Sequence, residues 1–344
     1  MRTVHSLAMA MVLTGVVLPR NASAWNRGHV RTFAVLPDGA SGPEGLEVDP
    51  SGNVYVGTFG FTHEGSAAGT GHIYVFDREG RMVRDVSVSG SSPHLLGLHW
   101  RASTGTLLVA DYGASQVLEV NPLTGDSTQL ASIPGAGLND ITEDRAGNVY
   151  VSDSTNGTVW KIASGSTGAT SWISSPLLAP TGVPPFGGNG LRFNHAETAL
   201  FVANTATDTI VKVPVDGSGA PGTPEVFVNS VNGADGLVVD ADDNLWVVAN
   251  QSDEIVVVDP SGRSVAKLGD FGGRLRDGAP VGLLFPASLR FAGQSLLVTN
   301  LSLDLRLFSP TYAAIDSPWC AAVTRYTVSA LPARIPPPGG DGDP

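Results

Sequence analysis

Four polar residues occupy one position of a recurring strand pattern. Glu44, Asn139, Asn189 and Asp235 each stand directly before an apolar strand that ends in a hairpin turn. A repeat fold brings equivalent positions of its repeats together, so four side-chain oxygens could meet at one point. Two carboxylates and two amides form a hard, all-oxygen set, which suits Ca²⁺ better than Zn²⁺. The pattern therefore predicts a calcium site, which could also accept another divalent cation.

The strand pattern itself recurs six times along the chain. Residues 45–56 and 140–151 show it best, as an apolar strand, a glycine turn and a second strand that begins Asn-Val-Tyr-Val. A spacing of roughly 40 to 50 residues is typical of propeller blades with four strands each. Plentiful glycine (42) and proline (24) also favour short strands and turns. We expect an all-β, six-bladed β-propeller of four-stranded antiparallel blades.

The ends of the chain indicate how the ring of blades closes. The last repeat offers only three strands, at 287–291, 295–299 and 322–328, before a tail rich in proline and glycine at 331–344. A strand at 30–36 precedes the first repeat and can supply the fourth, which leaves no free edge between the terminal blades. We expect one propeller domain at residues 25–330, closed by this N-terminal strand.

Residues 1–24 have the features of an export signal. Arg2 is followed by an apolar run at 7–18, and Ala22-Ser23-Ala24 matches the small-residue pattern of a cleavage site. The apolar run is too short for a membrane span, and no cysteine follows it that could carry a lipid. The sequence predicts a protein that is cut after Ala24 and is secreted or periplasmic.

Net charge and cysteine content make two classes of function less expected, nucleic-acid binding and cysteine-based catalysis. The formal net charge is −12, so nucleic acid is not an expected partner. Cys320 is the only cysteine, and no activating partner is evident near it in the sequence. We expect it to be a small buried residue rather than a nucleophile.

Strand direction places the four polar residues on one face of the propeller. Successive strands run antiparallel, so the entrance of each inner strand and the loop after each second strand share a face. The four residues belong to blades 1, 3, 4 and 5, whereas the equivalent positions in blades 2 and 6, near Leu96 and Ala287, are apolar. Asn-Gly and Asp-Gly alone are ordinary turn pairs, but their shared register with Glu44 favours a metal site at the mouth of the central channel.

Four motifs around these residues resemble the SMP-30/gluconolactonase/LRE-like family of six-bladed propellers, related to diisopropyl fluorophosphatase and paraoxonase. The resemblance covers about residues 30 to 328. It implies a divalent cation, usually calcium, and hydrolysis of lactones, esters or organophosphates. It assigns Glu44, Asn189 and Asp235 as metal ligands, and Asn139 as a ligand or a substrate contact. The motifs are Pro43-Glu44-Gly45-Leu46, Leu138-Asn139-Asp140, Gly188-Asn189-Gly190-Leu191 and Ala234-Asp235-Gly236-Leu237.

One departure from the family pattern bears on the substrate. Sugar-lactonase members often carry an arginine two positions before the asparagine that corresponds to Asn139, and this chain has Gly137 there. The sequence therefore resembles the family's metal site more closely than its sugar site. A less polar small-molecule lactone or ester is at least as good a candidate as gluconolactone.

The chemistry that the resemblance implies is metal-assisted hydrolysis. Calcium would polarise the substrate carbonyl, and Asp235 would accept a proton from the attacking water or act as the nucleophile. His94 is a second catalytic candidate, because paraoxonase-like members have a histidine in this region. It lies two residues from the ligand register, however, and could be an ordinary loop residue. Asp153, Asn204 and Asn250 follow second strands, where such side chains commonly stabilise loops. Asp153 and Asn204 could also support the site from behind.

Two other functions fit the same sequence. The propeller could be a secreted binding module in which calcium only stiffens the channel. It could also be related to strictosidine synthase, which uses this architecture for condensation rather than hydrolysis.

Overall fold

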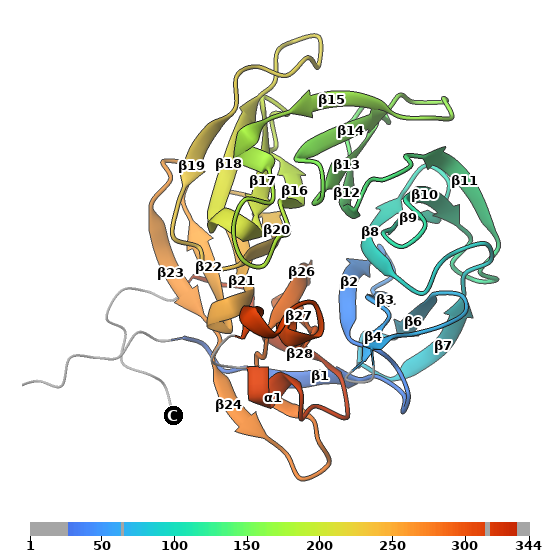
Figure 1. Ribbon diagram of the computed structural model, residues 1–344, viewed down its shortest axis with the longest axis vertical. Helices are drawn as coiled ribbons and strands as arrows, with labels where there is room; N and C mark the ends of the chain where they lie inside the picture. The colour runs from blue at the N-terminus through green and yellow to red at the C-terminus, as the bar shows by residue number, and fades with distance from the viewer. Residues whose placement is uncertain (1–26, 63–64, 314–316, 336–344) are drawn as a thin grey trace, which may run out of the picture.

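The computed structural model describes residues 27–62, 65–313 and 317–335. Within them, six four-stranded antiparallel sheets are arranged around a central axis (Figure 1). The prediction of an all-β, six-bladed propeller is therefore confirmed. The expected export signal at 1–24 and most of the tail, residues 336–344, lie outside the described residues. In the described ranges no helix has the length and apolar character needed to cross a bilayer.

Each blade is a meander of four strands, and the first five blades follow chain order. Blade 1 contains β2 (Pro43–Val48), β3 (Val54–Thr58), β6 (His72–Phe76) and β7 (Met82–Ser87). Blade 2 contains β8 (Leu95–Arg101), β9 (Thr106–Asp111), β10 (Gln116–Val120) and β11 (Ser127–Ser132). Blade 3 contains β12 (Leu138–Glu143), β13 (Val149–Asp153), β14 (Thr158–Ile162) and β15 (Thr170–Ser174). Blade 4 contains β16 (Gly188–Phe193), β17 (Ala199–Asn204), β18 (Thr209–Pro214) and β19 (Glu225–Val228), and blade 5 contains β20 (Ala234–Val239), β21 (Leu245–Ala249), β22 (Glu254–Val258) and β23 (Ser264–Leu268).

Blade 6 combines both ends of the described chain. It contains β26 (Pro286–Ala292), β27 (Ser295–Asn300), β28 (Thr327–Pro332) and β1 (Arg31–Val35), and β1 pairs antiparallel with β28 (Figure 1). The predicted closure by the N-terminal strand is thus confirmed. The third strand lies at 327–332 rather than at 322–328, and Pro332 pairs opposite Ser295. A proline fits there because the end of a strand loses few ladder hydrogen bonds.

Short hairpins and helical turns lie in the connections between these strands. Two hairpins, β4 (Phe61–Thr62) with β5 (Gly65–Ser66) and β24 (Phe271–Arg274) with β25 (Pro280–Gly282), stand outside the blades. Single helical turns occur at η1 (Pro176–Leu178), η2 (Thr205–Thr207) and η3 (Asn250–Ser252). The long connection between β27 and β28 contains η4 (Leu305–Leu307), η5 (Pro310–Tyr312) and α1 (Ser317–Cys320), in which Cys320 is buried as expected.

Ring closure makes a direct prediction about truncation. Ala34 and Leu36 of the N-terminal segment are buried in the core that joins blades 6 and 1. A chain lacking residues 25–36 would lose these contacts and expose the edge of β28, so we expect it to unfold or aggregate. A chain lacking residues 336–344 should melt like the full-length protein. Circular dichroism melts of both truncations test this, and a normal melt after loss of residues 25–36 would refute the closure.

One aspartate holds the recurring turn between the first two strands in three blades. In blade 1, Asp49 accepts hydrogen bonds from the backbone N–H groups of Ser51 (2.8 Å) and Asn53 (2.9 Å) and from the Tyr55 hydroxyl (3.1 Å). The side-chain amide of Asn53 donates to the same carboxylate at 2.8 Å. This arrangement explains the recurring Asn-x-aromatic sequence, since each aromatic group packs in a blade while its polar atom is satisfied. Blades 3 and 5 repeat it with Asp144, Asn148 and Tyr150, and with Asp240, Asn244 and Trp246.

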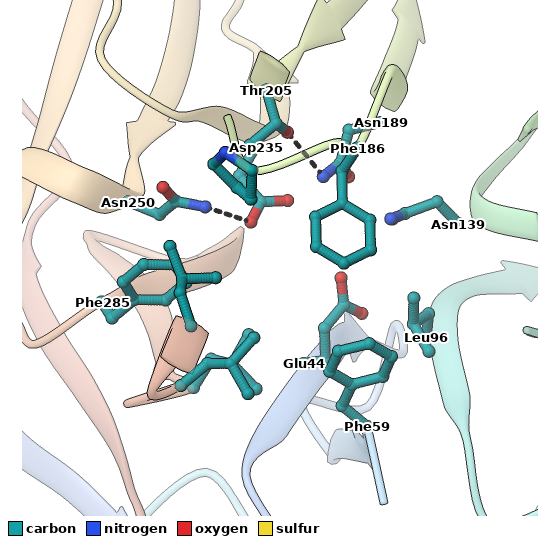
Figure 2. A pocket seen from close by; sticks show the side chains of 14 residues that line it. Glu44, Phe59, Leu96, Asn139, Phe186, Asn189, Thr205, Asp235, Asn250 and Phe285 are labelled. Carbon is teal, nitrogen blue, oxygen red and sulfur yellow. Dashed lines mark hydrogen bonds between the residues drawn. The ribbon is translucent and has the colours of Figure 1, made fainter. Parts of the chain in front are cut away.

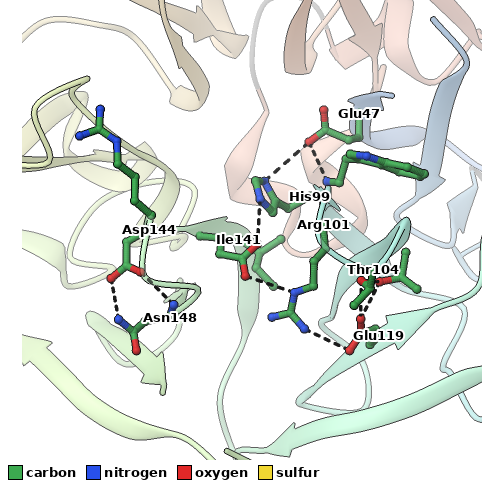
Figure 3. Close-up of polar contacts among 12 residues, drawn as sticks. Glu47, His99, Arg101, Thr104, Glu119, Ile141, Asp144 and Asn148 are labelled. Carbon is green, nitrogen blue, oxygen red and sulfur yellow. Dashed lines mark hydrogen bonds and ion pairs between the residues drawn. The ribbon is translucent and has the colours of Figure 1, made fainter. Parts of the chain in front are cut away.

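Charged side chains fill the end of the channel where the inner strands finish. Glu47 of blade 1 lies 3.4 Å from Arg290 of blade 6 and 3.9 Å from His99 of blade 2. His99 in turn lies 3.7 Å from Glu143, which pairs with Arg101 at 3.2 Å (Figure 3). These contacts link blades 6, 1, 2 and 3 at this end. The opposite end, where the inner strands begin, holds the candidate site.

Candidate functional site

Every inner strand has an irregularity at its start. The register shifts in all six blades, for example between Pro43 and Leu46 in blade 1 and between Ala234 and Leu237 in blade 5. A bulge of this kind releases residues from the ladder and redirects their side chains. The first bulge residue of each blade is the predicted ligand position. These residues are Glu44, Leu96, Asn139, Asn189, Asp235 and Ala287.

The second bulge residue is glycine in four blades because the next blade leaves no room for a side chain. A Cβ on Gly236 would lie 2.6 Å from the carbonyl oxygen of Ala287, and one on Gly45 would collide with the carbonyl oxygen of Leu96. Glycine therefore allows the inner strands to approach closely. In blade 3 the position is Asp140, whose carboxylate lies 2.8 Å from the Arg192 guanidinium of blade 4.

Glu44, Asn139, Asn189 and Asp235, here called the oxygen cluster, line one cavity at this end of the channel (Figure 2). All four are buried, with at most 7% of their surface exposed. The space that the centre of a water molecule can reach in the cavity is about 30 Å³. The structure thus brings together the four residues that the sequence placed in one register, in a space suited to an ion.

Burial makes the two carboxylates of the cluster unusually basic. It raises the pKa of Glu44 well above its usual range, and the negative charges of Asp235 and Asp140 add to this, while Arg290 opposes it. Burial also raises the pKa of Asp235 to about 7, against a hydrogen bond from Asn250 and with added repulsion from Asp140. Two carboxylates buried this closely are strongly disfavoured as a pair of anions, and a divalent cation would remove that penalty.

Hydrogen bonds leave oxygen atoms of the cluster available to such a cation. Asn250 donates to Asp235 Oδ2 at 3.0 Å, while Asp235 Oδ1 is buried without a hydrogen-bond partner in the described structure. Asn189 donates through Nδ2 to Thr205 Oγ1 at 3.0 Å, which fixes the orientation of its amide. Buried polar atoms are rarely unpartnered, and exceptions often mark an ion or ordered water. The donor set fits a hard cation such as Ca²⁺.

The Asn139 side-chain amide can adopt either of two orientations. Its Oδ1 is buried and has no hydrogen-bond partner among the described residues, whereas its nitrogen faces the cluster in Figure 2. A 180° rotation of the amide exchanges oxygen and nitrogen. Asn139 can therefore present either an oxygen to a cation or an N–H group to a substrate.

Residues 89–269 match the family model described as the SMP-30/gluconolactonase/LRE-like region. The chain belongs to this family. The matched segment contains Asn139, Asn189 and Asp235 of the oxygen cluster. Residues 32–60, which contain Glu44, match the N-terminal model of strictosidine synthase-like proteins. No curated protein sequence matches the chain.

Solved structures of SMP-30/gluconolactonase-like and related proteins share the fold at low identity. A luciferin-regenerating enzyme superposes with a TM-score of 0.62 at 16% identity, covering 89% of this chain and 95% of its own. A gluconolactonase from Xanthomonas campestris gives 0.60 at 15% identity, covering 88% and 89%. Regucalcin, a calcium-binding protein from Agrobacterium tumefaciens, gives 0.60 at 19% identity, covering 90% and 97%. Similarity at this level establishes the propeller and not the substrate.

A second group of site residues in this SMP-30/gluconolactonase/LRE-like chain was not predicted from the sequence. Each of them lies one position after the end of the second strand of its blade. Thr205 orients Asn189 and also donates to the carbonyl oxygen of Ala234 at 2.7 Å. Asn250 orients Asp235. Phe59 and Leu301 line the cavity from the same position in blades 1 and 6. The repeat register could have found them, had it been followed one residue past the end of each second strand.

Asp153 and Asn204 are not among the residues that line the cavity, and both stabilise loops. Asp153 accepts a hydrogen bond from the backbone N–H of Gly137 at 3.0 Å. Asn204 donates to the carbonyl oxygen of Leu177 at 2.9 Å. Each contacts a segment that leads into an inner strand.

His94 lies beside the cavity and is not among the residues that line it. Its ring is 4.7 Å from that of Phe61 and 6.1 Å from that of Phe59, which separates it from the cluster. His94 Nδ1 contacts the carbonyl oxygen of Phe59, and Nε2 lies 3.0 Å from Ser66 Oγ, so both ring nitrogens are engaged away from the cavity. Of the two predicted catalytic residues, only Asp235 lies in the cavity.

The raised pKa values predict how pH affects calcium binding. Without metal, protonated carboxyls in the cluster favour the folded state below the unfolded pKa of about 4, and this contribution is lost as pH rises to about 7. Calcium needs the ionised carboxylates, so the increase in Tm that it causes should grow from about pH 5 to about pH 8. Melting curves across this range with calcium or with chelator test this. A calcium effect of constant size would contradict the assignment.

Proposed function

We propose that the protein is a calcium-dependent hydrolase of lactones or esters, exported to the periplasm or the medium. The observation that supports this most is the oxygen cluster. Its two buried carboxylates have raised pKa values, and Asp235 Oδ1 and Asn139 Oδ1 have no hydrogen-bond partner among the described residues. Membership of the SMP-30/gluconolactonase/LRE-like family supports the lactonase type of reaction. The predicted cleavage site after Ala24 supports export.

Each residue of the site has a role in this proposal. Calcium, when bound, would polarise the substrate carbonyl and stabilise negative charge on its oxygen. Glu44 and Asn189 hold the ion, and Asn139 contacts either the ion or the substrate. Asn250 fixes Asp235 Oδ2, so Asp235 Oδ1 faces the cavity as the proton acceptor.

Asp235 transfers a proton in both steps of the proposed hydrolysis. Asp235 takes a proton from water as the water oxygen bonds to the carbonyl carbon. It returns the proton to the alkoxy oxygen as the bond from carbon to that oxygen breaks. The product is a hydroxy acid from a lactone, or an acid and an alcohol from an ester.

The surroundings of Gly137 favour a less polar substrate than a sugar lactone. A Cβ on Gly137 would collide with Thr155 Oγ1 and lie 3.0 Å from the Tyr112 ring. No arginine can replace this glycine without rearrangement of both neighbours. The hydroxyl-binding arginine expected of sugar-lactonase members thus has no space at this position.

A substrate panel with metal control tests the proposal. Purified protein is assayed on aliphatic lactones, gluconolactone and aryl esters, first with chelator and then with calcium restored. We expect hydrolysis of at least one lactone or ester that chelator abolishes and calcium restores. Calcium binding without turnover of any compound would favour the binding-module alternative. Condensation of an amine with an aldehyde, without hydrolysis, would favour the strictosidine-synthase-like alternative that the match at 32–60 keeps open.

A further inference from the structure

We propose that the substrate carries an apolar substituent next to its lactone or ester group, and that an aromatic lid formed by Phe59, Phe186 and Phe308 binds it. This inference rests on the proposed function for the reacting group and concerns the rest of the substrate. It follows from the cavity walls, from the position of Phe308 and from the small free volume above the oxygen cluster.

The cavity walls beyond the oxygen cluster are mostly hydrocarbon. Phenylalanine, leucine and proline side chains make up eight of the 14 lining residues, and Leu301, Leu303 and Leu305 come from one connection. The remaining polar residues, Thr205 and Asn250, already hold Asn189 and Asp235. Among the described residues that line the cavity, only Glu44 and Asp235 are ionisable. A polyhydroxylated substrate would leave hydroxyl groups unpaired against these walls, which is costly, whereas an alkyl or aryl group would not.

Phe308 joins opposite sides of the cavity mouth. It lies in the connection between β27 and β28, directly after η4. Its ring is 5.6 Å from that of Phe186, which precedes blade 4, and 6.4 Å from that of Phe59, which follows the second strand of blade 1. In Figure 2 the Phe186 ring extends across the view of the oxygen cluster. Phe308 thus packs behind Phe59 and Phe186, which line the cavity, and the three rings together form a wall between the cavity and the exposed face of Phe308.

The small size of the cavity indicates that the lid moves when a substituted substrate binds. The centre of a water molecule can reach only about 30 Å³, which leaves little room for a lactone ring with a substituent beside an ion. Phe308 is 38% exposed, so its ring has room to move outward. An apolar substituent would then replace the contacts that the aromatic rings make with one another. Affinity should accordingly increase with the apolar surface that the substituent buries.

A series of γ-lactams tests this substrate class without requiring turnover, because lactams keep the carbonyl but resist hydrolysis. The full chain, loaded with calcium, is titrated calorimetrically with γ-lactams whose alkyl substituent grows one methylene at a time. We expect affinity to rise about threefold to fourfold per methylene. In Phe308→Ala this dependence should be weaker than in the wild type. Phe186→Ala should act in the same direction.

Leu123→Ala provides the matched control. Leu123 is 66% exposed and lies between β10 and β11, away from the cavity, so its loss should leave the chain-length dependence intact. Melting curves verify that each variant is folded. Affinity that is independent of chain length in the wild type, or equal dependence in wild type and Phe308→Ala, would overturn the proposal.

Assays of the matching γ-lactones separate this inference from the proposed function. Lactam binding that depends on chain length, without hydrolysis of any lactone, would support the apolar subsite and contradict the hydrolase. Hydrolysis of lactones together with a flat lactam series would support the hydrolase and contradict the subsite.

Discussion

Replacing Asp235 with asparagine should lower turnover by a factor of about 10² to 10⁴ while calcium still binds. The asparagine keeps one side-chain oxygen that can coordinate the ion, and a 180° rotation of the Asn250 amide would restore a hydrogen bond between the two side chains. The amide cannot accept a proton from water at neutral pH, however. The measurement is lactone or ester turnover by wild type and Asp235→Asn at saturating calcium, with calcium affinity determined calorimetrically on the same samples.

Glu44→Gln is the matched control for this variant, because it makes the same chemical change at the other carboxylate of the cluster. Glu44 is assigned only one role, which is to hold the ion. Loss of its charge should therefore weaken calcium binding, and a higher calcium concentration should compensate for the weaker binding. Turnover of Glu44→Gln should therefore recover, and that of Asp235→Asn should not. Full recovery of turnover by Asp235→Asn at high calcium would show that Asp235 is a metal ligand only.

Calcium should raise the melting temperature of the purified protein, and chelator should reverse the increase. A ligand that binds only the native state stabilises it by about 2.7 kcal/mol at a hundredfold excess over the dissociation constant. Glu44→Ala and Asp235→Ala should abolish this effect, because each removes one of two carboxylates that face the same cavity. Differential scanning calorimetry with calcium and with chelator provides the measurement.

The control for the melting experiment is Asp38→Ala, which removes a carboxylate that is 93% exposed. It changes the net charge as the cluster variants do and should keep the full calcium effect. An unchanged melting curve after chelation, together with no metal by elemental analysis, would show that the oxygen cluster is not a metal site.

Periodicity explains how much of this molecule could be predicted from its sequence. Glu44, Asn139, Asn189 and Asp235 were found because each starts an inner strand, and the repeat sets their common position. Closure by β1 was found because the last repeat lacked a strand. Both predictions depend on regular structure, where a residue's place in the repeat determines the direction of its side chain.

The parts that escaped prediction lie in irregular connections. Phe186 and Phe308 come from segments whose lengths no repeat constrains, so nothing in the sequence indicated that their rings would meet above the cluster. The third strand of blade 6 was placed too early because Ser317–Cys320 forms a helical turn within an unusually long connection. Asn250 was interpreted as a loop residue, although its hydrogen bond to Asp235 makes it part of the site.

One titration tests the central proposal most directly. Protein stripped with chelator is titrated with calcium, and bound calcium and hydrolysis of the best lactone or ester are measured on the same sample. The proposal predicts no turnover at the start, a rise that follows binding of one calcium ion at the oxygen cluster, and no rise in Glu44→Ala over the same calcium range. Full turnover by protein that elemental analysis shows to be free of metal would contradict it.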